Sequence, residues 1–161
     1  MQASEIYERI KSKFEDAIVE FKADAIVEPY LEVKPDRIRE ICEFLRDEPE
    51  LAFDYLMCLS GVDYANGALG VVYHIYSMKH GHRFVLKVKV PVENPVVQSV
   101  ESVWKSANWH EREAYDMFGI IFDGHPDLRR ILMPYDWPEG SYPLRKDFQV
   151  PEFYNGMKIP Y

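Results

Sequence analysis

The side chains that could do chemistry are concentrated in positions 109–132, where acidic, basic, histidine and aromatic residues follow one another closely. Glu111 and Glu113 could act as general acid and base, because their surroundings can push the pKa values of neighbouring carboxylates apart. His110 precedes them and is the residue type most often used for proton transfer. The run contains no nucleophile with an activating base. A free-standing acid–base enzyme is therefore one hypothesis, and a structural role for these charges is the other.

A structural role explains the same charges if this segment is a helix. Arg112 and Asp116 would then stand four residues apart and could form an ion pair. Glu111 and Glu113 would lie in the first turn, where the helix dipole stabilises negative charge. Because these local roles account for all four residues, they favour packing over catalysis.

Metal and nucleotide sites are not indicated. The zinc-protease helix needs a second histidine four positions after the first, and here Ala114 stands four positions after His110. His80 and His82 could pair on a strand face to bind a metal, although two polar residues at a hairpin tip are the commoner explanation. Neither cysteine belongs to a Cys-x-x-Cys pair, and the chain has no phosphate-binding loop. We therefore expect no bound metal, cluster or nucleotide.

A second charged group follows His125. Asp127, Arg129 and Arg130 stand in what we predict to be a short helical turn. Two arginines can clamp a carboxylate or a phosphate in fork geometry, and they can also remain as solvated surface charge. A third explanation is ion pairing with another subunit, because interfacial charges need defined partners. The same alternatives apply to a further basic pair, Arg145 and Lys146.

Composition restricts the class of protein. A chain of 161 residues, 47% of them apolar, forms one ordinary domain with a real core. Its net charge of -8 argues against a nucleic-acid-binding face, and no apolar run approaches the roughly 20 residues that span a bilayer. The first residues lack the basic-then-apolar order of a signal peptide. Cys42 and Cys58 lie in apolar stretches, as expected of buried free thiols in a reducing cytosol.

The first third of the chain predicts a helix, two strands and a second helix. Ser4 is the expected N-cap of the first helix. Positions 17–21 and 25–33 have the character of extended segments, and the second alternates as a half-exposed strand does. Pro35 begins a second helix in the favoured first turn, and Pro49 closes it. The buried stripe of this helix consists of Ile38, Ile41, Cys42 and Leu45.

The middle of the chain contains the clearest hairpin. After an apolar but irregular stretch at 55–64, strands are predicted at 70–78 and 83–90. Gly81 supplies the unusual backbone conformation of the turn between them. Positions 96–105 have mixed periodicity, which we interpret as a helix.

A further helix is predicted at 108–118. Asn108 and Glu111 are spaced as in a capping box, and Gly119 provides the stop. Together the elements predict an α+β fold with a mainly antiparallel sheet and helices packed on one face.

The composition changes after Met133. The chain from there to its end is rich in proline, which breaks helices and central strands, and it is also rich in aromatic residues. Such a segment is expected to lie extended across a surface. We therefore assign residues 1–133 to the α+β domain and residues 134–161 to an extended tail that packs on partner subunits.

Residues of this charged region occur in a recognisable order. They are Glu111-Arg112-Glu113, Asp116, Met117-Phe118, His125, Arg129 and Ile131-Leu132, and the runs at 124–132 and 142–148 belong to the same pattern. This order resembles the signature of the 30 kDa subunit (the C subunit) of respiratory NADH–quinone oxidoreductase, complex I. Many members of that family continue the second run with proline, whereas this chain has Gln149. That departure concerns the path of the final residues and not the resemblance.

The resemblance implies a non-catalytic subunit in the peripheral arm of a proton-pumping complex that passes electrons from NADH to quinone. Such a subunit holds no cofactor, and the flavin, the iron–sulfur clusters and the quinone belong to its partners. Those partners are other peripheral-arm subunits, chiefly the 49 kDa-type subunit and the cluster-bearing subunits. The resemblance also implies a place at the cytoplasmic face of the cell membrane, with the membrane contacted only through the complex and no nucleic acid bound.

The charged residues of the signature would either hold the junction between domain and tail or contact a neighbouring subunit. Two other functions stay open. One is the equivalent subunit of an F420H2 dehydrogenase or a membrane-bound energy-converting hydrogenase, and the other is the free-standing acid–base enzyme. The predicted interface or structural residues are Glu111, Arg112, Glu113, Asp116, His125, Asp127, Arg129, Arg130, Arg145 and Lys146.

Overall fold

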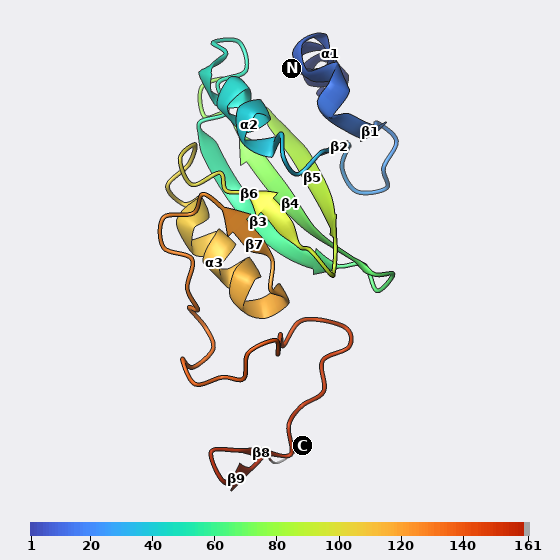
Figure 1. Cartoon of the computed structure of the whole chain (residues 1–161). Helices are drawn as coiled ribbons and strands as arrows, with labels where there is room; N and C mark the ends of the chain where they lie inside the picture. The colour runs from blue at the N-terminus through green and yellow to red at the C-terminus, as the bar shows by residue number, and fades with distance from the viewer. Residues whose placement is uncertain (160–161) are drawn as a thin grey trace.

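A five-stranded sheet is the centre of the fold. In the computed structural model, which describes residues 1–159, the strands are hydrogen-bonded in the order β1-β2-β5-β4-β3 (Figure 1). Neighbouring strands are antiparallel except for β2 and β5. The predicted α+β class with a mainly antiparallel sheet is therefore confirmed. The strands are β1 (Ile18–Lys22), β2 (Tyr30–Val33), β3 (Tyr55–Asp63), β4 (Ala68–Tyr76) and β5 (Arg83–Pro91).

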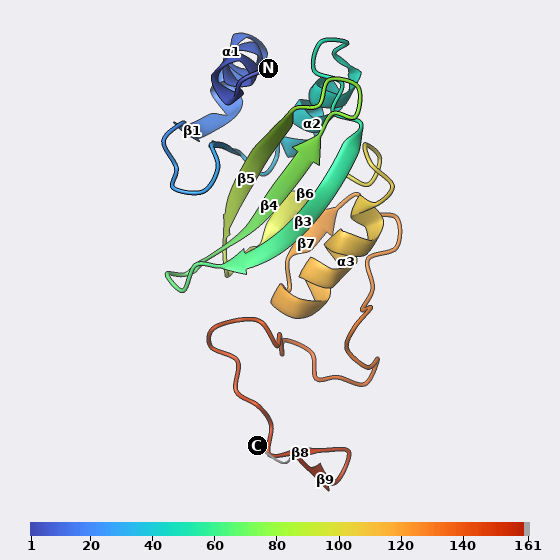
Figure 2. The ribbon, with the colours of Figure 1, turned by 180° about the vertical axis from the view of Figure 1, so that it is seen from behind.

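Within the described residues, three α-helices and a short 3-10 helix accompany the sheet. They are α1 (Ala3–Phe14), η1 (Glu15–Ala17), α2 (Ile38–Asp47) and α3 (Ala107–Phe118). In Figure 2, α2 and α3 lie behind β5, β4 and β3, so both pack on the same face of the sheet. The predicted stripe of α2 is buried there as expected, together with alternate residues of the strands. The largest fully buried apolar side chains include Tyr73, Phe53, Phe122, Ile6, Ile10 and Leu31.

The predicted starts of the first two helices are wrong by a few residues. Helix α1 begins before Ser4, and the Glu5 carboxylate accepts a hydrogen bond from the Gln2 backbone N–H at 2.8 Å. Helix α2 begins at Ile38 rather than at Pro35, because the residues from Pro35 onward first form a turn. Helix α1 is therefore capped at Gln2 by a capping box with Glu5, two residues before the predicted cap, and the start of α2 is delayed by the turn that precedes it.

Two stretches of strand were misjudged. The irregular stretch at 55–64 is β3, a long edge strand, and a register shift between Leu56 and Cys58 explains why its apolar residues do not alternate regularly. The extended segment predicted at 25–33 is a strand only from Tyr30 onward. The hairpin between β4 and β5 is confirmed, and Gly81 adopts φ +66° in its turn.

The helix predicted at 96–105 does not form. Instead β6 (Val96–Gln98) pairs in parallel with β7 (Ile121–Asp123), and turns follow it. Three apolar residues of this stretch, Val100, Val103 and Trp104, are nevertheless buried. Mixed periodicity thus reflected a short strand followed by turns, and the pairing partner lies beyond α3.

Residues 134–159 consist mostly of turns and extended chain, and they hang below α3 in Figures 1 and 2. They end in a small hairpin, β8 (Phe153–Tyr154) with β9 (Met157–Lys158), which the sequence analysis missed. Its two-residue Asn-Gly turn has positive φ at both positions, Asn155 (50°) and Gly156 (77°), as type I′ requires. Pro160 and Tyr161 of the predicted tail lie outside the described residues.

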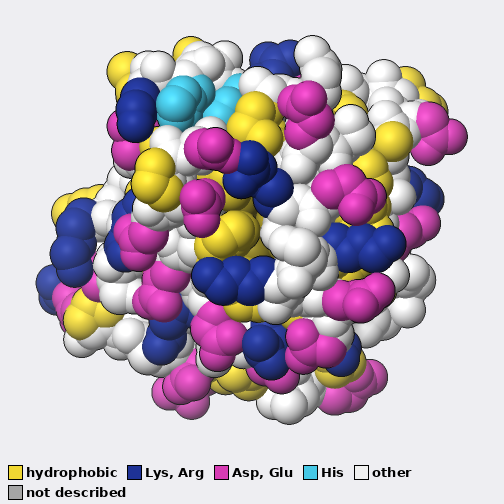
Figure 3. All heavy atoms as spheres, turned by 90° about the horizontal axis from the view of Figure 1, so that it is seen from above, with side chains coloured by type: hydrophobic (Ala, Val, Ile, Leu, Met, Phe, Trp, Pro, Cys, Tyr) yellow, Lys and Arg dark blue, Asp and Glu magenta, His cyan; other side chains and the backbone are white. Residues whose placement is uncertain are grey.

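The surface is charged and mixed in sign. Figure 3 shows acidic and basic side chains interspersed over one end of the molecule, with histidine side chains visible at one corner of that face. None of the helices within residues 1–159 is long and apolar enough to cross a membrane.

Candidate functional site

Asp116 is fully buried and holds the segment that leads into the tail. Its Oδ2 accepts hydrogen bonds from the backbone N–H groups of Ile131, Leu132 and Met133 at 3.0, 2.7 and 2.8 Å. Its Oδ1 accepts one from Arg130 Nη1 at 3.1 Å. A buried carboxylate with four donors is satisfied without any external ligand. Helix α3 and the segment after β7 are therefore joined into one unit.

Arg112 fixes the same segment one helical turn earlier. Its Nε donates to the Arg129 carbonyl at 3.2 Å and its Nη2 to the Arg130 carbonyl at 3.3 Å. In Figure 1 this segment descends beside α3. Arg112 and Asp116 thus each bond to the neighbouring segment, and the ion pair predicted between them does not form.

The capping box predicted for α3 is wrong. The helix begins one residue earlier, with Ser106 at its N-cap, so Asn108 lies inside its first turn. Neither Glu111 nor Glu113 lies in that turn, which also contradicts the predicted dipole role. Glu111 is fully buried, and its carboxylate accepts hydrogen bonds from Ser99 Oγ at 2.6 Å and the Val100 N–H at 2.7 Å. These bonds join α3 to the loop after β6.

The carboxyl of Glu111 titrates near neutral pH. Burial raises its pKa from 4.5 to about 7, although the hydrogen bonds from Ser99 and Val100 oppose that rise. Burial also raises the pKa values of Cys42 and Tyr73, and the charge of Glu111 adds to both effects. Burial therefore disfavours the charge of Glu111, and that charge in turn disfavours ionisation of Cys42 and Tyr73.

His125 is packed against the start of α3. Its Nδ1 accepts a hydrogen bond from the Asp127 N–H at 3.0 Å, so its Nε2 carries the proton and donates to the Asn108 carbonyl at 3.2 Å. The segment forms turns without a helix, so the predicted helical turn is wrong. Arg129 pairs with Asp127 at 2.9 Å on the surface, with both side chains more than half exposed. It does not join Arg130 in a fork.

A second attachment joins the tail to the body at the end of α3. Arg145 Nε donates to the Phe118 carbonyl at 2.6 Å, and the Arg145 guanidinium lies 4.3 Å from the centroid of the Tyr142 ring. The Lys146 backbone N–H donates to Asp63 Oδ2 at 2.7 Å, and this bond holds the pKa of the Asp63 carboxyl below its ordinary value. The Lys146 side chain itself remains exposed.

Replacing Gly119 by alanine should loosen this second attachment. Gly119 has φ +74°, and a Cβ there would meet the Tyr142 ring. The backbone strain alone costs about 1–3 kcal/mol, and displacement of the ring adds to it. Gly140→Ala is the matched control, because Gly140 has φ +75° with open space around it. We expect chemical denaturation to give a clearly lower free energy of unfolding for Gly119→Ala than for Gly140→Ala. Equal values would contradict the proposed packing of Tyr142.

The residues considered for acid–base catalysis do not converge. Glu111 is buried and Glu113 is exposed, as expected for residues two apart on a helix, which are rotated by about 200° around the axis and so lie on nearly opposite sides. His110 is half-buried and makes no hydrogen bond with either among the residues described. No common point is available at which these groups could act on one substrate.

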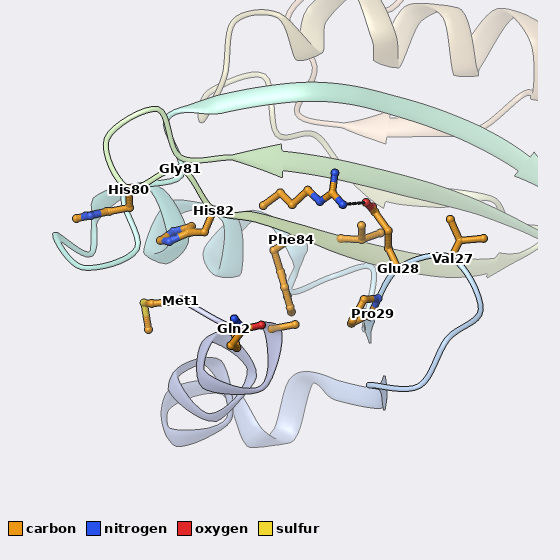
Figure 4. A pocket seen from close by; sticks show the side chains of 12 residues that line it. Met1, Gln2, Val27, Glu28, Pro29, His80, Gly81, His82 and Phe84 are labelled. Carbon is orange, nitrogen blue, oxygen red and sulfur yellow. Dashed lines mark ion pairs between the residues drawn. The ribbon is translucent and has the colours of Figure 1, made fainter.

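A hollow of about 370 Å³ lies between α1, the chain before β2 and the β4–β5 hairpin (Figure 4). Its wall carries an ion pair between Arg83 and Glu28 at 2.9 Å. His80 and His82 bond through Nε2 to carbonyl groups of the loop after α2, at 2.9 and 2.7 Å. Their rings are stacked with planes 16° apart, so their lone pairs point along separate planes rather than at one metal ion. The histidine pair is therefore explained by hydrogen bonds from the hairpin to backbone carbonyl groups and not by metal binding.

Metal-ligating side chains are not grouped elsewhere in residues 1–159: no three of His, Cys, Asp and Glu come together there. Both cysteines are free thiols, Cys42 buried and Cys58 partly exposed, so burial was predicted correctly for the first only.

Several partners of the signature were missed from the sequence. Ser99 contacts Glu111, and Asp63 contacts the backbone of Lys146. No local pattern marks these two residues, because they lie 12 and 83 positions away in the chain from the groups that they contact. One sequence feature pointed toward the contact between Gly119 and Tyr142. Gly119 was already predicted to end the helix, where a residue without a side chain leaves room for a neighbouring ring.

The chain matches a known family over most of its length. The family described as "Respiratory-chain NADH dehydrogenase, 30 Kd subunit" matches residues 31–154. The NADH-quinone oxidoreductase C subunit of Chlorobium phaeobacteroides is 49% identical over 163 residues, covering 99% of this chain and 96% of that one. The C subunit of Chloroherpeton thalassium is 47% identical over 156 residues, covering 96% of this chain and 64% of that longer one.

Two solved structures resemble the fold. The first is Nqo5 in a trypsin-resistant fragment, with 29% identity, a TM-score of 0.64, and coverage of 80% of this chain and 100% of that one. The second is a chain of the membrane-bound sulfane sulfur reductase, described as an archaeal respiratory membrane complex. It has a TM-score of 0.73, covers 93% of this chain and 87% of that one, and at 24% identity shows a common fold alone.

Proposed function

Because the chain belongs to the 30 kDa subunit family of the respiratory-chain NADH dehydrogenase, we propose that it acts as a non-catalytic assembly subunit. It would stand in the peripheral arm of a proton-pumping NADH–quinone oxidoreductase. The relatives that share about half of its residues carry the name of that complex, which favours it over the hydrogenase-like alternatives. The likeness to the sulfane sulfur reductase chain supports the fold and not a second function.

One observation supports the proposal most strongly. Charged side chains of the signature form hydrogen bonds with the backbone of the chain itself. Arg112 and Arg145 donate to carbonyl groups, and Asp116 accepts from three backbone N–H groups and an arginine. Groups satisfied in this way position a chain segment and are not free to bind substrate. The signature thus favours a rigid scaffold that presents its tail in a fixed direction.

The tail supplies the surface for partners in this proposal. It exposes large apolar side chains, and burying them against a partner would be energetically favourable. Contact with the 49 kDa-type subunit and with cluster-bearing subunits would cover them, and those partners would hold the flavin, clusters and quinone. The chain would reach the cytoplasmic face of the membrane only through the complex. The exposed side chains are Tyr135 (82%), Leu144 (52%), Val150 (58%), Phe153 (57%) and Met157 (66%).

The solved structure of Nqo5 is consistent with a compact body in this chain. Nqo5 was solved as a trypsin-resistant fragment, and the whole of that fragment corresponds to 80% of this chain. This correspondence supports a body that folds as a unit.

Truncation after Met133 is the direct test. Asp116 keeps its backbone partners in the shortened chain, so the body should fold and keep a cooperative unfolding transition. When the tagged chain is co-expressed with the other subunits, the truncated form should recover far less of them than the full chain. Full recovery of the partners by a folded, truncated chain would contradict the role of the tail.

A further inference from the structure

The edge strand β3 turns two neighbouring side chains to the same face of the sheet. Leu56 and Leu59 are both buried in the core although they are three residues apart, because the register against β4 shifts between Leu56 and Cys58. The extra residue at this shift is Met57. Its side chain and that of Cys58 therefore lie on the face opposite α2 and α3, which is turned toward the viewer in Figure 2. A thioether and a thiol are thus placed side by side.

A histidine of β4 completes the group. His74 is the register partner of Cys58, and side chains directly opposite each other on neighbouring strands have Cβ atoms about 5 Å apart. The residues on either side of it, Tyr73 and Ile75, are fully buried in the core, so the imidazole lies on the outer face. Met57, Cys58 and His74 together line a hollow of about 350 Å³, and apolar residues of β5 form part of its wall.

Two observations indicate that these side chains are available to a ligand. Cys58 is a free, partly exposed thiol, and its Sγ makes only a weak hydrogen bond with Ser60 Oγ at 3.2 Å. The Nδ1 atom of His74 is buried and has no hydrogen-bond partner among the described residues. Buried polar atoms nearly always have a partner, so an unsatisfied ring nitrogen opposite a thiol points to a bound group.

The chemistry of this hollow favours a soft, monovalent metal ion. A thioether, a thiolate and an imidazole are ligands that suit copper(I). The carboxylate in the same wall, Glu28, is paired with Arg83 at 2.9 Å, so it is not free for a hard cation such as Mg²⁺. The Arg83 guanidinium also lines the hollow, and its positive charge repels a divalent ion more strongly than a monovalent one. Zinc, which binds thiolate, imidazole and carboxylate ligands, is therefore a poorer fit.

We propose that Met57, Cys58 and His74 form a copper(I) site on the outer face of the sheet. The ligands are the Cys58 thiolate, the Met57 thioether sulfur and a ring nitrogen of His74. The thiolate and the ion together are neutral, which lowers the cost of holding them in a partly buried place. The bound ion joins β3 to β4 where the register shift interrupts their ladder.

This site was not foreseen from the sequence, from which we expected no bound metal. Pairs of histidines and Cys-x-x-Cys pairs are local patterns, whereas Cys58 and His74 meet only because β3 pairs with β4. The set also falls short of three His, Cys, Asp or Glu side chains within residues 1–159, since its third ligand is a methionine.

Competition with the coloured chelator bicinchoninate tests the site on the full, reduced chain. The wild type should remove copper(I) from its bicinchoninate complex up to one ion per chain. Cys58→Ser, Met57→Leu and His74→Gln should each weaken binding by at least about 10-fold, as losses around a metal ion do. Met78→Leu is the matched control, because Met78 is also exposed (68%) but does not line the hollow, and it should bind as the wild type does.

Three results of this titration would overturn the proposal. One is the absence of copper(I) binding by the wild type. Another is wild-type affinity in Met57→Leu and His74→Gln, because a lone thiol would then account for the binding. The third is zinc binding as tight as that of copper(I) and lost in the same variants, because the ion would then not be soft and monovalent.

Alkylation of the wild-type chain gives a second measurement that needs no substitution. Cys58 should react with iodoacetamide in the folded chain, whereas the fully buried Cys42 should not. Copper(I) at one equivalent should protect Cys58. Unchanged alkylation of Cys58 would overturn the site even if a variant failed to fold. Both measurements use this chain alone, so neither depends on the proposed assembly.

Discussion

Replacing Asp116 by alanine is expected to lower the free energy of unfolding by about 3–5 kcal/mol, the usual cost of breaking a buried charged pair. Asp116 is fully buried, and its loss leaves three backbone N–H groups and Arg130 without their acceptor. The segment that follows β7 should then separate from α3. Urea denaturation should show the lower stability. Hydrogen exchange should show fast exchange at Ile131, Leu132 and Met133.

Asp127→Ala is the matched control for this prediction. Asp127 is also an aspartate paired with an arginine of the same segment, but the pair with Arg129 is more than half exposed on both sides. Exposed pairs contribute little, so the change should stay within about 0.5 kcal/mol. Equal effects of the two substitutions would show that the buried carboxylate does not hold the segment.

The stability of the protein should fall as pH rises from 4.5 to 7 because of Glu111. In the folded state burial raises its pKa to about 7, whereas the unfolded chain has the ordinary value of 4.5. Below 4.5 both states hold the proton, and between the two values only the folded state holds it. Rising pH therefore favours unfolding up to about 7 and has no further effect above it. At 1.36 kcal/mol for each pH unit, the contribution lost is about 3 kcal/mol.

Glu111→Gln should remove this contribution while keeping the geometry. The glutamine Oε1 can accept from the Val100 N–H, and its amide group can donate to Ser99 Oγ in place of the bond that Ser99 now donates. We expect the variant to match the wild type near pH 4.5 and to be more stable by about 3 kcal/mol at pH 8. Parallel stability curves for the two proteins across this range would contradict the raised pKa. The comparison isolates Glu111, because every other carboxyl is common to both proteins.

The elements were predictable where one periodicity dominated. The stripe of α2 and the β4–β5 hairpin with Gly81 followed from spacing and turn chemistry, and both are confirmed. The stretch at 55–64 and the helix at 96–105 were misjudged because their structure depends on distant partners. A register shift obscures the alternation of β3, and β6 is a strand only because β7 pairs with it from beyond α3. The hairpin at Asn155 and Gly156 was within reach, since its turn signal is local, and it was overlooked.

The sequence by itself determined the family, the charged run that marks it and the helix that carries half of the charges of that run. It could not determine which group each charge contacts, because spacing on a helix predicts only neighbours on that helix. The tertiary structure brings the segment after β7 beside α3 and the loop after β6 against its buried side, and each segment supplies backbone groups to a different carboxylate of the helix, Asp116 and Glu111. Arg112 and Asp116 therefore bond to that segment rather than to each other. Glu111 lies in the core, where burial and not helix position sets its pKa.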